Sequence, residues 1–173
     1  KELKDMMKFA ITAYGPIVIR YPRGGEEGLI KIKSQKPMFY GKAEKLLDGK
    51  DVSIIAIGKM VERAMWVAKE LKKRGINAEV INTRFLKPID KNCMMQSIKK
   101  TKFVVTIEDG TIINGLASAI NEIILNNNIK DVKKINFAYP DKFIRQGSIE
   151  ELEKIYGLNK ENILKQIEKI IEK

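Results

Sequence analysis

The residues best suited to bind a ligand lie in a short turn near the start of the chain. The apolar run 17–21 predicts a buried strand of a parallel sheet, and a turn over 22–25 follows it. Ligands of open α/β sheets bind beyond the carboxyl ends of the strands, which is where this turn would place Arg23. A planar guanidinium there suits a phosphate or a carboxylate. The alternative is that Arg23 pairs with a nearby carboxylate and only braces the turn.

Two other predicted strands end in charged residues. Arg84 follows 78–82, and it could either contact a ligand or form a structural ion pair. Glu108 and Asp109 follow 103–107. Their carboxylates could do acid–base chemistry or bind a metal, or they could cap a helix and hydrogen-bond the loop.

Three further loops carry weaker signals. Gly58 follows a predicted strand but lacks the later glycines of a dinucleotide fingerprint, so it predicts only a tight turn into a helix. The small residues of 114–118 open a helix and suit either close packing or an anion at the helix N-terminus. The loop 139–147 carries two aromatic residues and could serve as an interface or as a latch on the core.

Composition narrows the class of protein. The chain has 173 residues, of which 44% are hydrophobic and 32% charged, which is typical of a soluble globular domain. No apolar run approaches the roughly 20 residues of a membrane span, so no membrane partner is expected. The absence of histidine excludes Ser-His and Cys-His catalysis within the chain and argues against zinc. The single cysteine, Cys93, fits a core position and a reducing, cytoplasmic location.

The net charge of +11 raises the question of a nucleic-acid partner. Most of the 33 basic residues are lysines that alternate with glutamates along predicted helices, as on a solvated helix face. No basic block is interleaved with aromatic residues that could stack on bases. We therefore expect no nucleic-acid partner.

The loops are positioned by alternating strands and helices. The strands are predicted at 39–47, 51–57, 78–82, 103–107 and 134–137, and the helices at 2–13, 58–74, 91–99, 114–126, 148–156 and 163–171. A tight turn at Asp48-Gly49 predicts a hairpin between the first two of these strands. The pattern indicates an α/β fold of three layers, α/β/α, whose sheet is mostly parallel with one antiparallel strand. The loop up to Pro37 is the best candidate for a domain boundary.

Four motifs in order carry a family resemblance. They are Arg20-Tyr21-Pro22-Arg23-Gly24, Thr83-Arg84-Phe85-Leu86-Lys87-Pro88-Ile89-Asp90, Glu108-Asp109-Gly110 and Pro140-Asp141-Lys142-Phe143-Ile144-Arg145-Gln146-Gly147. With them the whole chain resembles the C-terminal portion of the 1-deoxy-D-xylulose-5-phosphate synthases, transketolase-like enzymes that use thiamine diphosphate. The resemblance implies that 1–24 end a central pyrimidine-binding domain, 25–37 form a linker and 38–173 form a transketolase C-terminal-like domain.

The resemblance also implies a function. The parent enzyme would condense pyruvate with glyceraldehyde 3-phosphate, with loss of carbon dioxide, in the first step of non-mevalonate isoprenoid synthesis. Arg23 would bind the phosphate of glyceraldehyde 3-phosphate. The family's active-site histidine and its residues for thiamine diphosphate and magnesium would lie upstream of Lys1, so this chain alone would hold no catalytic, cofactor or metal site and would be inactive. The family forms dimers, and a homodimer is expected.

Two alternatives remain open at this point. The first is another thiamine-dependent relative, such as a transketolase or the β subunit of a 2-oxo acid dehydrogenase. The second is a non-catalytic α/β domain that binds a phosphorylated ligand or a partner protein.

Overall fold

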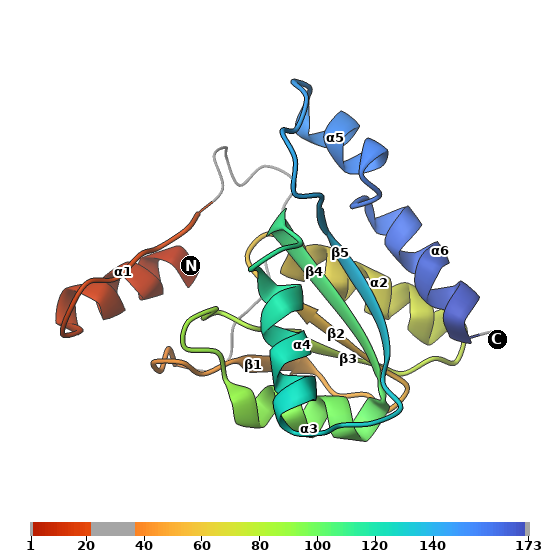
Figure 1. Ribbon diagram of the computed structural model, residues 1–173, viewed down its shortest axis with the longest axis horizontal. Helices are drawn as coiled ribbons and strands as arrows, with labels where there is room; N and C mark the ends of the chain where they lie inside the picture. The colour runs from red at the N-terminus through yellow and green to blue at the C-terminus, as the bar shows by residue number, and fades with distance from the viewer. Residues whose placement is uncertain (1, 22–36, 172–173) are drawn as a thin grey trace.

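A five-stranded sheet between two layers of helices forms the body of the molecule (Figure 1). The computed structural model describes residues 2–21 and 37–171. We call 2–21 the N-terminal segment and 37–171 the sheet domain. The strands are β1 (Glu44–Leu47), β2 (Val52–Ala56), β3 (Ala78–Asn82), β4 (Phe103–Thr111) and β5 (Lys133–Tyr139); the helices are α1 (Glu2–Thr12), α2 (Met60–Lys73), α3 (Lys91–Thr101), α4 (Leu116–Asn126), α5 (Ile149–Ile155) and α6 (Lys160–Ile171).

The strand order is β1-β3-β2-β4-β5. Strand β1 runs antiparallel to β3, and the other neighbouring pairs are parallel. The predicted α/β class with one antiparallel strand is therefore confirmed. The chain turns to one side of β2 for β3 and to the other side for β4, so the carboxyl ends of β2 and β4 flank the point where the direction of winding changes.

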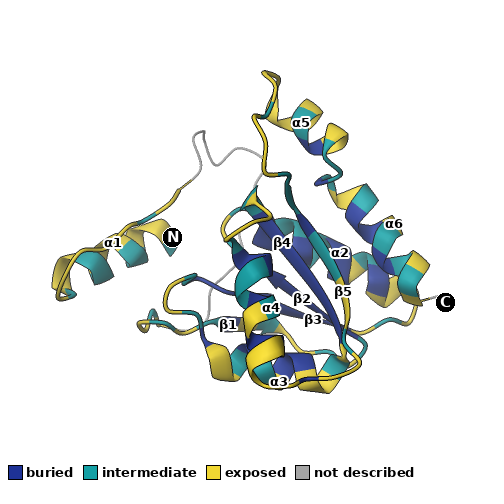
Figure 2. Cartoon of the chain, in the orientation of Figure 1, coloured by how far each residue is buried: buried dark blue, intermediate teal, exposed yellow. Residues whose placement is uncertain are grey.

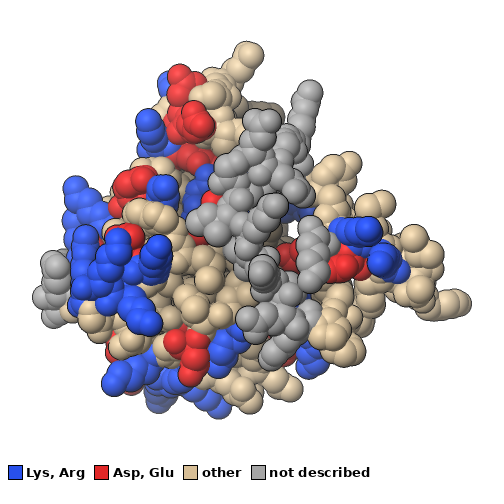
Figure 3. All heavy atoms as spheres, turned by 180° about the vertical axis from the view of Figure 1, so that it is seen from behind, with Lys and Arg blue, Asp and Glu red and all other residues tan. Residues whose placement is uncertain are grey.

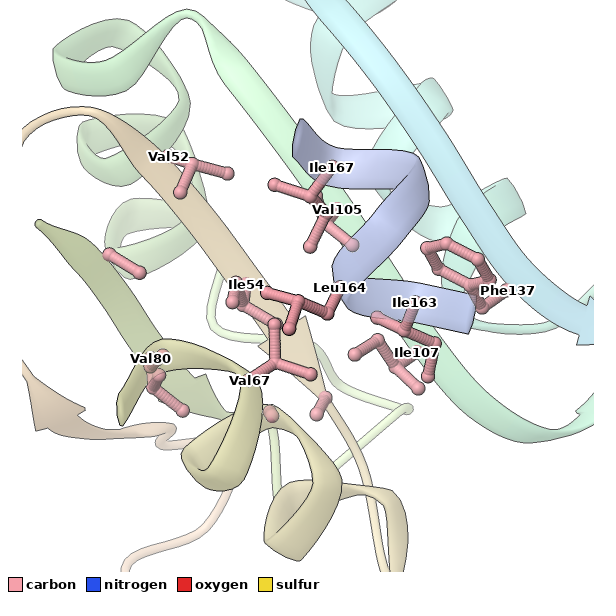
Figure 4. Close-up of a cluster of buried hydrophobic side chains, with 14 of the residues drawn as sticks. Val52, Ile54, Val67, Val80, Val105, Ile107, Phe137, Ile163, Leu164 and Ile167 are labelled. Atoms are coloured by element: carbon pink, nitrogen blue, oxygen red, sulfur yellow. The ribbon is translucent and has the colours of Figure 1, made fainter. Parts of the chain in front are cut away.

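Two hydrophobic clusters cover the two faces of the sheet. Alternate residues of β2 point to opposite faces: Ile54 packs with α2 and α6 (Figure 4), whereas Ile55 packs with α3 and α4. All five residues of β2 are buried, since helices lie on both sides of this strand (Figure 2). A polar contact tightens the second face, where Ser53 Oγ lies 2.6 Å from Ser97 Oγ of α3.

The predicted hairpin between 39–47 and 51–57 is wrong. The structure has a shorter strand there, β1, and it pairs with β3, with Glu44 opposite Asn82. The chain then crosses the start of β3 to reach β2. Gly49 makes this crossing feasible, because a Cβ at that residue would lie 2.3 Å from the carbonyl carbon of Ala78. The backbone N–H groups of Lys50 and Asp51 donate to the Asn77 carbonyl at 3.1 Å.

The predicted buried strand at 17–21 is also wrong. These residues form no strand, and Val18 is 89% exposed. A run of β-branched residues forms a strand only where a neighbouring strand can pair with the run. None of the five strands in the described ranges pairs with residues 17–21. Helix α1 lies beside the sheet domain in Figure 1, and none of its eleven residues, all of them described, is buried.

Two predicted helix starts are confirmed. Asp90 caps α3 by accepting a hydrogen bond from the Cys93 backbone N–H at 3.2 Å. Ser148 and Glu151 form the predicted capping box of α5, and the hydrogen bond from the Ser148 backbone N–H lowers the pKa of the Glu151 carboxyl. Among the described residues, no helix is both long and apolar enough to cross a bilayer.

Candidate functional site

Arg23, the predicted phosphate-binding residue, lies outside the residues that the structure describes. The residues just before it reach the carboxyl end of the sheet. Arg20 Nη2 donates a hydrogen bond of 3.4 Å to the backbone carbonyl of Asp109, at the end of β4. Arg20 therefore lies at the carboxyl edge of the sheet, the edge at which ligands of open α/β sheets bind, although the strand predicted to place Arg23 there is absent.

A network of charged side chains joins three elements at this edge. Lys59 Nζ lies 3.0 Å from Asp109 Oδ2 and 3.5 Å from Glu153 Oε1, and Arg63 pairs with the same Glu153 carboxylate. Lys59 precedes α2, Asp109 belongs to β4 and Glu153 to α5. Two cations and two carboxylates neutralise one another here, so the network braces the edge and leaves no unbalanced charge among these four groups.

Tyr139 lies beside this network at the end of β5. Burial, reinforced by the nearby negative charges of Asp109 and Glu153, raises the pKa of the Tyr139 phenol to about 12. Its ring packs edge-on against Tyr156, with centroids 5.4 Å apart. The other aromatic residue of this loop, Phe143, is fully exposed. Tyr139 thus packs on the core, as the latch alternative predicts, whereas Phe143 does not, and an interface at this loop stays a prediction.

Glu108 caps a helix. Its carboxylate accepts hydrogen bonds from the backbone N–H groups of Leu116 and Ala117 at 2.8 and 3.0 Å, at the start of α4. The approach is so close that a Cβ at Gly115 would lie 2.1 Å from Glu108 Oε2. The capping alternative is therefore the right one for Glu108. The alternative of an external anion at 114–118 is wrong, because the chain's own carboxylate occupies that helix N-terminus.

Arg84 forms structural ion pairs, which was one of its two predicted roles. The side chain is 2% exposed and pairs with Glu44, and its Nε lies 3.3 Å from Glu2 Oε1. Nη1 also donates to the Pro37 carbonyl at 3.3 Å. No local pattern predicts these partners, because Glu44 and Glu2 lie 40 and 82 residues away along the chain.

The remaining predicted positions have structural roles. Gly58 has a φ of +61° in the turn between β2 and α2, as a tight strand–helix turn requires. Cys93 is half-buried and packs against the cluster under α3 and α4. Within the described ranges, no group of three or more histidine, cysteine or acidic residues could hold a metal ion.

Basic and acidic side chains lie intermixed on the surface. Figure 3 shows one face, on which lysine and arginine side chains are most numerous toward one edge and acidic side chains lie among them. Lys73, for example, pairs with Glu70 at 2.8 Å one turn earlier in α2, and Arg74 pairs with Glu168 of α6. The expected lack of a nucleic-acid partner stays a prediction.

Known proteins similar to this chain include 1-deoxy-D-xylulose-5-phosphate synthases and a transketolase. The family model for the transketolase C-terminal domain matches residues 41–163. The chain is 38% identical over 171 residues to a 1-deoxy-D-xylulose-5-phosphate synthase of Clostridium tetani, covering 99% of this chain and 27% of that protein. It is 41% identical over 167 residues to the synthase of Clostridium acetobutylicum, covering 96% of this chain and 27% of the relative.

The chain thus spans about a quarter of the length of these relatives and is homologous to that part of them. A solved structure described as a split gene transketolase, inactive beta4 tetramer, superposes with a TM-score of 0.74 at 30% identity, over 83% of this chain and 47% of that one. Because the family model matches well over half of the chain, the protein belongs to the transketolase C-terminal domain family.

Proposed function

We propose that this chain is the C-terminal part of a 1-deoxy-D-xylulose-5-phosphate synthase. The observation that carries the proposal is an identity of 34 to 41% with synthases over 94 to 99% of the chain. The complete enzyme would condense pyruvate with glyceraldehyde 3-phosphate, with loss of carbon dioxide, to give 1-deoxy-D-xylulose 5-phosphate.

We further propose three segments in the chain. Residues 38–173 form the transketolase C-terminal-like domain, 25–37 are a linker and 1–24 end the preceding domain. Two observations support this division: the family match begins at residue 41, and α1 contributes no buried residue to the sheet domain.

Within this function, Arg23 binds the phosphate of the acceptor aldehyde. A guanidinium offers two parallel N–H donors to phosphate oxygens, and fixing that end of the substrate orients its aldehyde carbon for attack. The position of Arg20 at the carboxyl end of β4 supports a site at this edge.

Thiamine diphosphate and magnesium belong to the preceding domains in this proposal. The thiazolium carbanion supplies the carbon–carbon chemistry when the cofactor is bound. The family model that matches this chain is that of a C-terminal domain, and the match covers residues 41–163. We therefore propose that the chain alone is inactive, and the solved relative described as an inactive tetramer supports this.

The complete enzyme is further proposed to be a cytoplasmic homodimer. Exposed apolar side chains at the edge of the sheet domain, among them Phe143 and Ile113, suit an interface between copies. A single cysteine suits a reducing compartment.

A chimera tests the function directly. The matching 171 residues of the Clostridium tetani synthase are replaced by this chain, and the product is measured with pyruvate, glyceraldehyde 3-phosphate, thiamine diphosphate and magnesium. We expect 1-deoxy-D-xylulose 5-phosphate from the chimera and none from the 173-residue chain alone. A folded chimera that prefers a ketose phosphate donor would identify a transketolase instead, and product from the chain alone would overturn the proposed inactivity.

A further inference from the structure

The turn after β3 holds an arginine in an uncommon setting. Arg84 has a φ of +56° and a side chain that is 2% exposed. A buried guanidinium and a left-handed backbone at a residue other than glycine each cost free energy, and such features persist where surrounding contacts stabilise them. The proposed function assigns no role to Arg84.

Among the described residues, the partners of Arg84 come from three separate parts of the chain. It pairs with Glu2 at the start of α1 and with Glu44 of β1, and it donates to the Pro37 carbonyl. Asn82 reinforces the contact with α1, because its Nδ2 lies 3.0 and 3.2 Å from the two carboxylate oxygens of Glu2. The Asn82 side-chain oxygen in turn accepts a 3.2 Å hydrogen bond from the Arg84 backbone N–H.

The next residue of the turn contacts the same helix. The Phe85 ring lies edge-on to Phe9 of α1, with centroids 5.7 Å apart, and Tyr40 stacks on Phe9 at 5.9 Å. Glu2 and Phe9 are seven residues apart and so lie on one face of the helix. Helix α1 therefore contacts the sheet domain along about 10 Å of its length, with a polar contact at one end and an aromatic contact two turns later.

We propose that the turn 83–90 positions the N-terminal segment on the sheet domain, with Arg84 as the positioning residue. Arg84 touches no substrate in this account and acts by holding Glu2. The other end of the segment is held by Arg20 on the Asp109 carbonyl. The consequence for catalysis rests on the proposed function: Arg23 follows Arg20 by three residues, so displacement of the segment weakens acceptor binding.

The first test measures the position of α1 in the 173-residue chain without reference to activity. Glu2→Lys places a cation against Arg84, and Asp5→Lys is its matched control, because Asp5 is also an acidic residue of the first turn of α1. Spin labels at Lys8→Cys and Lys69→Cys, both exposed positions, in a Cys93→Ser chain report the distance between α1 and α2. We expect one narrow distance distribution in the parent chain and in Asp5→Lys, and a broad one in Glu2→Lys. An equally narrow distribution in Glu2→Lys would overturn the proposal.

The second test measures the consequence in the chimera. Glu2→Lys should raise the KM for glyceraldehyde 3-phosphate about tenfold or more and leave the KM for pyruvate within about twofold. Asp5→Lys should change neither. A displaced helix with an unchanged acceptor KM would overturn the positioning role. An inactive parent chimera would instead contradict the proposed function, and the label distances would still decide whether Arg84 holds the helix.

Discussion

The N-terminal segment and the sheet domain are both rich in apolar residues, yet they use them differently. In the sheet domain, Ile54 of β2 and Leu71 of α2 are fully buried. In the segment, Ile11 is 83% exposed and Tyr14 is fully exposed. Apolar residues are buried only where a second apolar surface faces them, and the sheet domain supplies that surface to its own helices from both sides of the sheet.

The contacts that hold the two regions differ in kind as well. Two clusters of packed apolar side chains stabilise the sheet domain. The segment is held at a few points, which are Glu2 at Arg84, Phe9 at Phe85 and Arg20 at Asp109. Changes in the sheet domain should therefore alter global stability, whereas changes in the segment should alter its position.

The largest difference in stability between the two regions should come from truncating one isoleucine in each. Ile54→Ala leaves a cavity in the centre of β2 and should lower the free energy of unfolding by about 2–5 kcal/mol. Ile11→Ala in α1 should change it by less than about 0.5 kcal/mol. Urea unfolding of the two variants measures both values, and similar losses would show that α1 belongs to the cooperative core.

Within the sheet domain, two adjacent carboxylates should differ. Glu108→Ala leaves the first backbone N–H groups of α4 buried without an acceptor and should lower the free energy of unfolding by about 1–3 kcal/mol. Asp109→Ala removes a partly exposed ion pair with Lys59 and should cost about 0–1 kcal/mol. Urea unfolding of both variants measures these values. An equal loss of free energy of unfolding in the two variants would refute the capping role of Glu108.

Removal of residues 1–37 should have an effect between those of Glu108→Ala and Asp109→Ala. The sheet domain keeps both hydrophobic clusters and the pair between Arg84 and Glu44, and it loses the contacts of Glu2 and Phe9. Thermal unfolding of residues 38–173 should stay cooperative, with a loss of about 1–2 kcal/mol. An unfolded 38–173 chain would contradict the proposed domain boundary.

The smallest predicted effect is on the stability of the folded chain at alkaline pH. The pKa of Tyr139 is about 12, against 10.0 in the absence of its surroundings, so above pH 10 the unfolded chain loses this proton before the folded chain does. The contribution of the Tyr139 phenol to the free energy of unfolding is fully present below pH 10 and is lost as the pH rises toward 12. Tyr139→Phe should therefore lose less stability than the parent chain across this range. Tyr40→Phe, at an exposed position, is the control and should follow the parent.

The sequence predicted the sheet domain well because its signals are local. A continuous apolar run that ends at Gly58 located β2, and Ser148 with Glu151 marked the start of α5. The pairing of β1 was missed because Asp48-Gly49 is typical of a hairpin, whereas the close approach of Gly49 to Ala78 depends on a residue 29 positions away.

The candidate site was less predictable for the same reason. The capping of α4 by Glu108 and the pair between Lys59 and Asp109 join residues from different elements. The run 17–21 was predicted as a buried strand because apolar β-branched residues look alike in the sequence whether or not a sheet is present to pair with them.

The most direct test of the central claim is the kinetics of Arg23→Ala in the chimera with the Clostridium tetani synthase. The lost contact is a charge-assisted one, so we predict that the KM for glyceraldehyde 3-phosphate rises about ten- to hundredfold while the KM for pyruvate stays within about twofold. Equal changes in the two KM values, or no change in either, would contradict the assignment of Arg23 to the acceptor phosphate.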